Sequence, residues 1–400
     1  MSILRRSQKR LSRAIRRVFR GSIVNRLTIR DPLAPDQLRL LAFGDVLGPT
    51  FEINWLRPLA ASRSAGRTAL WLMEERAFED EAKLSRSAGT ARALDSLLLR
   101  MQPHLIAASR YGGESAALIV DAARRHNIPF VFHIDDNLLA VPPELGASKA
   151  AKYNSPKRIE AITCQLARAD LTYVSTEALL AQLQGLGVEI GRHYVGAIAG
   201  GVDPIDPPDI ARKKDRPLVL GYMASSGHTA DLALVTPSLV RIKTKWPDVR
   251  LEIFGSLAVP SELTNLISEV HPPIQGYEAF VARLASLNWD LGIAPLRGSS
   301  FNLAKTNTKW IEYTAAGIAV VCSDHPVYRQ AIDAGAAIGA ADDEWYTKLA
   351  DMITDAEARA STLRSAQRLL AEKYTLQHLR CQVADMLRYA GLRDLSDKVL

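Results

Sequence analysis

The sequence is poor in cysteine and has no long apolar run. Its three cysteines among 400 residues, Cys164, Cys322 and Cys381, are far apart in the chain. Such spacing excludes a disulfide framework and a cysteine-based zinc site, and it favours a reducing compartment. No apolar stretch approaches the roughly 18 residues that indicate a transmembrane helix. The hydrophobic share of 48% and the charged share of 23% are those of an ordinary globular protein.

Acidic residues are absent from the first 30 positions, which hold ten Lys or Arg. Subtracting these ten charges from the formal net charge of +7 leaves −3 for residues 31–400. On a helical projection of residues 1–20 the basic side chains occupy one side and the apolar ones the other. This pattern is typical of a helix that lies in an anionic membrane interface. A mitochondrial targeting peptide or a solvated tail are alternatives, and a nucleic-acid-binding arm is the least supported because the body is not basic.

Two series of alternating strands and helices follow this arm. We expect strands at Leu38–Phe43, Thr68–Met73, Leu105–Ser109, Phe130–Ile134, Leu171–Val174, His193–Val195, Val219–Met223, Arg250–Phe254, Leu291–Ala294, Val320–Cys322 and Ala337–Gly339. We expect helices at 51–62, 90–101, 114–126, 156–168, 177–186, 230–244, 261–269, 277–287, 306–316, 326–334, 343–357, 360–372 and 376–390. Alternation of this kind predicts parallel sheets that are covered by helices on both faces.

The stretch 201–216 is dense in proline and lacks apolar periodicity, so it reads as a linker between the two series. The expected organisation is therefore a basic arm at 1–30, an N-terminal domain at 31–205 and a C-terminal domain at 206–375. Two Rossmann-like domains that face a cleft suit this α/β pattern.

The most informative stretch is FNLAKTNTKWIEYTAAGIAVVCSD at 301–324. On the helix expected at 306–316, Lys305, Lys309 and Glu312 would share one face. Two lysines at a helix start oppose the helix dipole, and a bound anion would remove that conflict. The glutamate two turns later could accept hydrogen bonds from a ribose, so the pattern indicates a nucleoside diphosphate. The alternative is a solvent-exposed charged face with a Lys309–Glu312 pair.

This stretch resembles the donor-nucleotide segment of family 4 glycosyltransferases, which have the two-domain GT-B fold. The residues that carry the resemblance are Lys305, Lys309, Glu312, Tyr313, Gly317, Val320 and Val321. Many members have an acidic residue where this chain has Ala304, so contacts to the donor sugar would fall to Asn302 or to backbone amides of 298–304. The resemblance also implies that a terminal helix at about 376–400 packs back on the first domain.

Three further segments fit a donor site in the second half. The loop GYMASSGHTAD at 221–231 could hold phosphate with its amides and with Ser225 and Ser226. It resembles the corresponding loop of the family, in which His228 and Asp231 have counterparts, but it lacks the Arg or Lys that many members place there. In the 274–277 segment Tyr277 could stack on a base. Arg297 is a further candidate for the diphosphate. Each of these loops could equally be a plain turn.

The first half offers acids at a strand end. FHIDDN at 132–137 closes a buried strand with His133, Asp135 and Asp136, which could orient a sugar hydroxyl or stabilise positive charge at the reacting carbon. Helix capping by either aspartate is the simpler alternative, and a metal site is disfavoured because the acids are adjacent. On the acceptor side the resemblance points to Asn54, Arg57 and Arg110.

The resemblance implies a retaining glycosyltransferase that needs no metal or other cofactor. It would move a sugar from a nucleoside diphosphate sugar to a saccharide acceptor, in the assembly of cell-surface polysaccharide. The basic arm points to a lipid-linked acceptor and to a peripheral position on the inner face of the cell membrane. Another GT-B activity, such as a sugar-nucleotide epimerase or a phosphorylase, is the enzymatic alternative. A catalytically degenerate scaffold that binds membrane and a partner enzyme is the non-enzymatic one.

Overall fold

In the computed structural model, which describes residues 36–198, 200–203 and 216–400, the chain forms two compact units. The first contains residues 36–140, Lys152–Gly196 and Arg380–Leu400, and the second contains Val141–Ala151 and residues 197–379. The basic arm lies outside the described residues. Among the described helices none is long and apolar enough to cross a membrane.

The first unit is a six-stranded parallel sheet with the order β2-β1-β3-β4-β5-β6. Its strands are β1 (Leu38–Gly44), β2 (Thr68–Glu74), β3 (Leu105–Ser109), β4 (Phe130–Ile134), β5 (Leu171–Val174) and β6 (His193–Val195). Four of these six strands are buried at every residue, as expected of strands covered on both faces. The predicted strands of this half are confirmed to within a residue.

The helices of this unit are α2 (Pro49–Phe51), α3 (Arg57–Ser64), α4 (Glu75–Met101), α5 (Ala116–Arg125), α6 (Ala147–Tyr153, which ends in this unit), α7 (Pro156–Arg168), α8 (Glu177–Gly185), α16 (Leu376–Tyr389, which begins in the second unit) and α17 (Arg393–Ser396). A π-helical turn, Glu52–Leu56, joins α2 to α3. Phe51, Trp55 and Leu59 from this segment share a buried cluster with Val383 and Leu387 of α16. The terminal helix therefore contributes apolar side chains to the core of the first unit.

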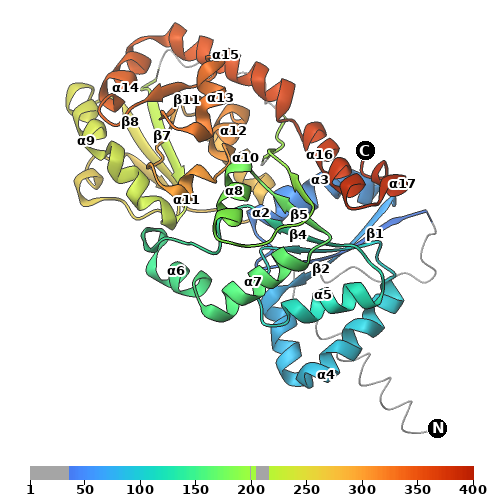
Figure 1. Cartoon of the computed structure of the whole chain (residues 1–400). Helices are drawn as coiled ribbons and strands as arrows, with labels where there is room; N and C mark the ends of the chain where they lie inside the picture. The colour runs from blue at the N-terminus through green and yellow to red at the C-terminus, as the bar shows by residue number, and fades with distance from the viewer. Residues whose placement is uncertain (1–35, 199, 204–215) are drawn as a thin grey trace, which may run out of the picture. The chain divides into compact units, whose positions relative to one another are not determined.

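The second unit is another six-stranded parallel sheet, with the order β12-β11-β10-β7-β8-β9. Its strands are β7 (Val219–Ala224), β8 (Arg250–Gly255), β9 (Glu269–His271), β10 (Leu291–Ala294), β11 (Ala319–Ser323) and β12 (Ile338–Ala340). Its helices are α9 (Thr229–Lys245), α10 (Tyr277–Ser286), α11 (Ser300–Leu303), α12 (Thr308–Ala315), α13 (Arg329–Asp333), α14 (Trp345–Thr354) and α15 (Ala356–Lys373). Figure 1 shows these helices around the sheet.

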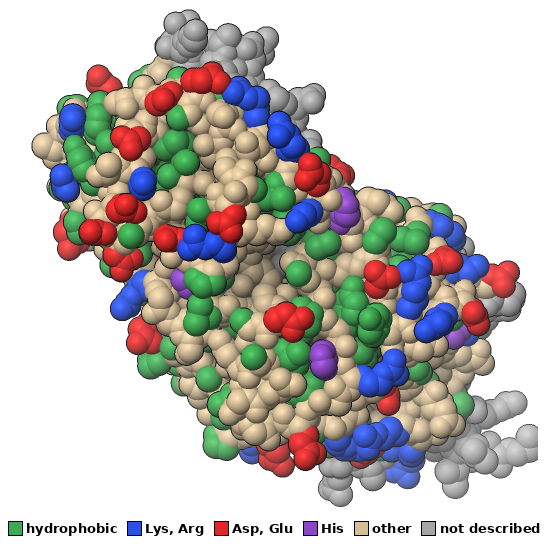
Figure 2. All heavy atoms as spheres, turned by 45° about the horizontal axis from the view of Figure 1, so that its top comes forward, with side chains coloured by type: hydrophobic (Ala, Val, Ile, Leu, Met, Phe, Trp, Pro, Cys, Tyr) green, Lys and Arg blue, Asp and Glu red, His purple; other side chains and the backbone are tan. Residues whose placement is uncertain are grey.

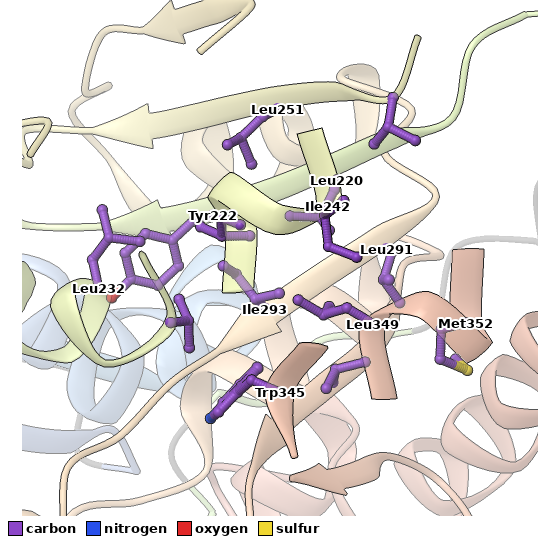
Figure 3. Close-up of a cluster of buried hydrophobic side chains, with 14 of the residues drawn as sticks. Leu220, Tyr222, Leu232, Ile242, Leu251, Leu291, Ile293, Trp345, Leu349 and Met352 are labelled. Carbon is purple, nitrogen blue, oxygen red and sulfur yellow. The ribbon is translucent and has the colours of Figure 1, made fainter. Parts of the chain in front are cut away.

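The core of the second unit forms where α9 and α14 pack on the sheet. Leu232 and Ile242 of α9 and Trp345 of α14 contact strand residues such as Leu220 and Ile293 (Figure 3). Close packing requires a glycine in β7, because a Cβ at Gly221 would lie 2.0 Å from the Trp289 ring. The strands and the helix faces around this core follow the periodicity of the sequence.

One predicted element of the second half is wrong. The segment 261–269 is not a helix but a short 3₁₀ turn, Ser261–Leu263, followed by the edge strand β9, which pairs in parallel with β8. Prolines at 260, 272 and 273 restrict both ends of the segment, and its few residues gain more from backbone pairing with β8 than from a short isolated helix. The helix predicted at 306–316 is also shorter, Thr308–Ala315, so Lys305 precedes it.

Charged side chains of both signs are interspersed over the face of the molecule in Figure 2. This agrees with a body that is nearly neutral once the arm is set aside. The described surface on that face therefore does not present the continuous basic area that nucleic acid would need.

Candidate functional site

The second unit contains a pocket of about 250 Å³ at the carboxyl ends of its central strands. Ligands of open parallel sheets bind at this edge. The volume lies a little below the usual range for small-molecule sites, roughly 300–1,000 Å³. The lining residues are Met223, Ala224, Ser225, His228, Phe254, Gly255, Ser256, Pro273, Ile274, Phe280, Lys309 and Glu312.

Lys309 lies in the first turn of α12 and brings positive charge to this pocket. Its ammonium donates to the Met223 carbonyl at 3.0 Å and lies 4.5 Å from the centroid of the Tyr222 ring. Burial, together with the nearby Lys305, lowers the pKa of Lys309 to about 8, although Asp231 and Glu312 oppose the shift. The free pocket thus holds an under-neutralised cation, which an anionic ligand would stabilise.

The first turn of α12 has no acidic residue, and no side chain caps its N-terminus. The dipole of the helix adds partial positive charge at this end, next to Lys309. Glu312 follows one turn later and lines the same pocket. Two of the three residues of the predicted lysine–glutamate face therefore meet at one cavity. Lys305 does not line it, because it precedes the helix, and its ammonium lies 5.6 Å from the Phe301 ring centroid.

Tyr313 fixes the position of α12 against the sheet. Its hydroxyl accepts a hydrogen bond from the Met223 N–H at 2.8 Å and donates to the Ile293 carbonyl at 3.2 Å. The ring lies so close to β10 that a Cβ at Gly292 would approach it to 2.9 Å. These two hydrogen bonds connect the helix that bears Lys309 to the neighbouring strands β7 and β10.

The loop after β7 contributes Ser225 and His228 to the pocket. His228 Nδ1 lies 2.8 Å from Asp231 Oδ2, and the Arg297 N–H donates to Asp231 Oδ1 at 3.0 Å. Burial, together with Lys309 and Lys305, lowers the pKa of His228 to about 4, although Asp231 partly opposes the shift. The imidazole is therefore neutral near pH 7.

The other wall of the pocket is apolar. Phe254 and Phe280 stack there with ring centroids 5.2 Å apart, and Ile274 and Pro273 complete the wall. Gly255 ends β8 with a φ of +130°, and a Cβ there would lie 2.1 Å from the Ala224 carbonyl oxygen. The sequence reasoning missed the Phe254–Phe280 wall. The phenylalanine and glycine that end a buried strand were the available signal.

Besides Lys305 and Arg297, three residues predicted for the donor side do not line the pocket. Tyr277 is 2% exposed, because the first residue of α10 points its ring into the protein, so Ile274 and Phe280 take the place expected for it. The Asn302 side chain is buried and donates to the Arg297 carbonyl at 2.9 Å, which holds the loop before α12. Ser226 is exposed, and its N–H donates to Ser256 Oγ at 3.3 Å.

In the first unit the acids after β4 are held by an arginine. Arg110 donates through one nitrogen to Asp135 at 2.7 Å and Asp136 at 3.0 Å, and Thr50 donates to Asp135 at 2.9 Å. Burial would lower the pKa of Arg110, but the two carboxylates raise it well above its usual value. Arg110, predicted as an acceptor ligand, thus orients the two aspartates, whose side chains remain 21% and 22% exposed.

The other predicted residues of this half are less accessible. His133 is 1% exposed, bonds Ser109 at 2.8 Å, and has a pKa lowered to about 4 by burial, so it is a neutral core side chain. Asn54 is 6% exposed and donates to the Thr50 carbonyl at 2.8 Å. Arg57 is half-buried at the start of α3. Direct contact of His133 or Asn54 with a substrate would need these side chains to move.

A buried ion network extends the Arg110 cluster along the same sheet edge, and the sequence reasoning missed it. Arg158 pairs with Asp45 at 3.1 Å and with Glu75 at 2.7 Å, and Lys152 pairs with Asp45 at 2.8 Å. A Cβ at Gly112 would lie 2.6 Å from the Arg158 side chain. Asp45 and Glu75 directly follow β1 and β2, so the rule that found Asp135 could also have found them.

Among the described residues one group has metal-ligand spacing, namely Glu252, Glu269 and His271. It does not belong to the pocket residues. One Glu252 oxygen accepts from the Trp289 indole at 2.8 Å, and Arg250 lies 3.0 Å from the other. Because N–H donors and a guanidinium already serve this carboxylate, the group is better explained as a buried polar network than as a cation site.

Comparison with solved structures supports the fold. HepE from Anabaena, solved with UDP-glucose, matches with a TM-score of 0.62 at 14% identity, over 88% of this chain and 100% of that chain. Sucrose-phosphate synthase from Thermosynechococcus elongatus matches with a TM-score of 0.58 at 11% identity, over 88% and 98%. A putative UDP-N-acetylglucosamine 2-epimerase from Listeria monocytogenes matches with a TM-score of 0.52 at 10% identity, over 88% and 96%.

No protein-family model and no curated protein matches the chain. Identities of this size establish the architecture alone. The chain has the two-domain α/β Rossmann-like fold of these solved structures, which confirms the fold class predicted from the sequence.

Proposed function

We propose that the chain is a glycosyltransferase of the GT-B type, similar to family 4, that uses a nucleoside diphosphate sugar as donor. The observation that carries this proposal is the meeting of Lys309, Glu312, His228 and Ser225 at one pocket, from two elements at the carboxyl edge of the second sheet. The solved neighbours that bind UDP or UDP-glucose make a uridine nucleotide the first candidate.

Each wall of the pocket suits one part of such a donor. The half-buried Lys309 and the uncapped first turn of α12 would bind the diphosphate. Glu312, one turn further, would accept hydrogen bonds from the ribose hydroxyls. The base would lie against the apolar wall of Ile274, Phe254 and Phe280. With the nucleotide in this position, the donor sugar would lie beyond the diphosphate, at the open end of the pocket.

Transfer requires stabilisation of the leaving diphosphate, on which negative charge develops as the glycosidic bond breaks. Lys309 would supply the positive charge that stabilises it. Lys305 lies nearby and lowers the pKa of both Lys309 and His228. On the acceptor side, Asp135 and Asp136, oriented by Arg110, would bind hydroxyl groups. We further propose retention of the anomeric configuration without a metal, as the family resemblance implies.

For the acceptor we propose a lipid-linked saccharide of a cell-surface polysaccharide. The support is the basic and amphipathic sequence of residues 1–20, which suits attachment to the inner face of a membrane. An epimerase acting on a UDP-sugar is the second candidate, because one neighbour of similar coverage bears that description. An epimerase needs the donor pocket but no acceptor, so the two candidates differ in their products.

The test begins with a thermal-shift screen of UDP, GDP, ADP and CDP and their hexose derivatives. A ligand at 100 times its Kd adds about 2.7 kcal/mol of stability. The best donor is then incubated with the protein, and the products are separated by chromatography. Release of the free nucleoside diphosphate with sugar transfer or hydrolysis supports the transferase, whereas conversion to an isomeric nucleotide sugar supports the epimerase. If no nucleotide stabilises the protein, both the transferase and the epimerase are contradicted, and the catalytically degenerate scaffold remains as the alternative.

A further inference from the structure

The loop between β7 and α9 has no lysine or arginine, although it borders the proposed phosphate side of the pocket. The side chain that stands there is His228, on the same pocket as Lys309. A second fixed cation is thus absent from this loop. A histidine can replace such a cation only when the imidazole is protonated. The protonation state of His228 therefore decides whether the loop attracts an anion.

Hydrogen bonding identifies the proton position on the ring. Asp231 accepts from the Arg297 N–H and lies 2.8 Å from His228 Nδ1. Burial would raise the pKa of Asp231, but His228 and the Arg297 N–H lower it overall, so the carboxylate is ionised. Nδ1 therefore carries the proton, and Nε2 carries the lone pair. Within the part of the chain that the structure describes, Nε2 makes no hydrogen bond, and His228 is 24% exposed toward solvent.

Three charged groups act on this ring, namely Lys309, Lys305 and Asp231, and other titratable groups lie on the elements around it. Burial, Lys309 and Lys305 keep the pKa of His228 near 4, so the imidazole is neutral in the empty pocket. A bound diphosphate would neutralise the two lysines and add an acceptor beside Nε2, and both changes favour the protonated ring. The titratable or charged residues around it are Asp231 on α9, Lys305, Lys309 and Glu312 at α12, Arg297 after β10, His325 after β11, and Glu144 from the turn 143–145 that packs on Gly227.

We propose that binding of the donor diphosphate takes up a proton at His228 Nε2, and that the resulting Asp231–imidazolium pair acts as the second cation on the diphosphate beside Lys309. The proposal rests on the donor site proposed above and adds a proton to it. Asp231 is the positioning residue, because it fixes the tautomer and holds the positive charge that forms.

Proton uptake makes the affinity depend on pH with a defined sign. Where the bound form is protonated and the free form is not, the Kd rises about tenfold per pH unit, because one proton enters with each ligand. This slope should extend from about pH 5 up to the pKa of His228 in the complex. Lys309 adds little at pH 6.5, because with a pKa of about 8 it is already protonated in the free protein.

The test is calorimetric titration of UDP-glucose into the full-length protein at pH 6.5, in two buffers with different heats of ionisation. The diphosphate of a nucleotide sugar does not titrate in this range, so any proton uptake belongs to the protein. We expect an uptake of about 0.7 proton or more per ligand. His228→Asn keeps a donor for Asp231 but loses Nε2, and should abolish the uptake and weaken binding about tenfold at pH 6. His193→Asn, at an exposed histidine of the first unit, should leave both unchanged.

A second variant separates charge from folding. His228→Lys supplies an ammonium that stays charged between pH 5 and pH 6.5, so it should bind at least as well as the unsubstituted protein and lose the pH dependence of the Kd over that range, in which Lys309 is also protonated. Binding of UDP-glucose without proton uptake, or uptake that persists in His228→Asn, overturns this inference and leaves the donor site standing. Failure of UDP-glucose to bind the unsubstituted protein overturns the inference together with the proposed uridine donor.

Discussion

Replacing Lys309 by methionine should make the free protein more stable and should strongly slow the proposed sugar transfer. The pKa of the buried ammonium falls from 10.5 to about 8, chiefly because of burial. The difference between these two values corresponds to about 3 kcal/mol of destabilisation of the charged form. Methionine has a similar length and no charge, so it removes this penalty. It also removes the hydrogen bond to the Met223 carbonyl, worth about 1 kcal/mol.

The net expectation for Lys309→Met is a gain of about 2 kcal/mol in the free energy of unfolding at pH 7, further reduced to the extent that water reaches the ammonium. For a unit of this size that is a rise in Tm of about 5 °C. The same substitution should lower turnover by roughly two orders of magnitude, as loss of one preorganised donor to a developing oxyanion does. Lys373→Met, at an exposed residue of α15, is the matched control and should change neither quantity.

The pH dependence gives an independent check. The folded pKa of Lys309 is below the unfolded value, so between pH 8 and pH 10.5 the unfolded chain binds more protons. The destabilising effect of the lysine is therefore full below pH 8 and disappears as the pH approaches 10.5. Urea denaturation at pH 7, 9 and 10 should show the advantage of Lys309→Met shrinking with pH. A variant that is less stable than the unsubstituted protein at pH 7, or an advantage independent of pH, would refute the reasoning.

Three further outcomes are expected. Glu312→Gln should raise the donor Kd while the protein still folds, and equal donor affinity would remove the ribose assignment. Tyr313→Phe leaves the Met223 N–H and the Ile293 carbonyl without their shared partner, and should lower the free energy of unfolding by about 1–3 kcal/mol in denaturant titrations. Deleting residues 1–30 should abolish salt-sensitive binding to anionic vesicles, measured by flotation, and spare transfer to a short soluble acceptor. Equal flotation of both forms would argue against membrane attachment.

Much of the fold could be predicted because the buried strands of a parallel sheet are recognisable in the sequence as continuous apolar runs. Buried runs such as Phe130–Ile134 are rich in apolar side chains at every position, and glycines, prolines and caps bound them. The failure at 261–269 shows the limit. An edge strand such as β9 is short and half-exposed, with Glu269 and Val270 exposed beside buried His271, so its pairing with β8 leaves no distinctive periodicity.

For the donor site, spacing along one helix was informative and loops were not. Lys309 and Glu312 are one turn apart on α12, so their common face follows from helix geometry. Tyr277 was misplaced because an N-terminal helix residue can point either way, and only tertiary packing decides that Phe280 faces the pocket instead. The role of Arg110 was hidden for a similar reason, since its partners lie 25 and 26 residues later in the chain.

The central claim is that a nucleoside diphosphate binds in the pocket of the second unit. Hydrogen–deuterium exchange with and without saturating UDP tests it directly, because the lining amides come from separate segments of the chain. The account predicts slower exchange in peptides that cover Met223–His228, Phe254–Ser256 and Thr308–Glu312, with the effect lost in Lys309→Met. Slower exchange confined to other segments, or no change at all under conditions in which UDP stabilises the protein, would contradict it.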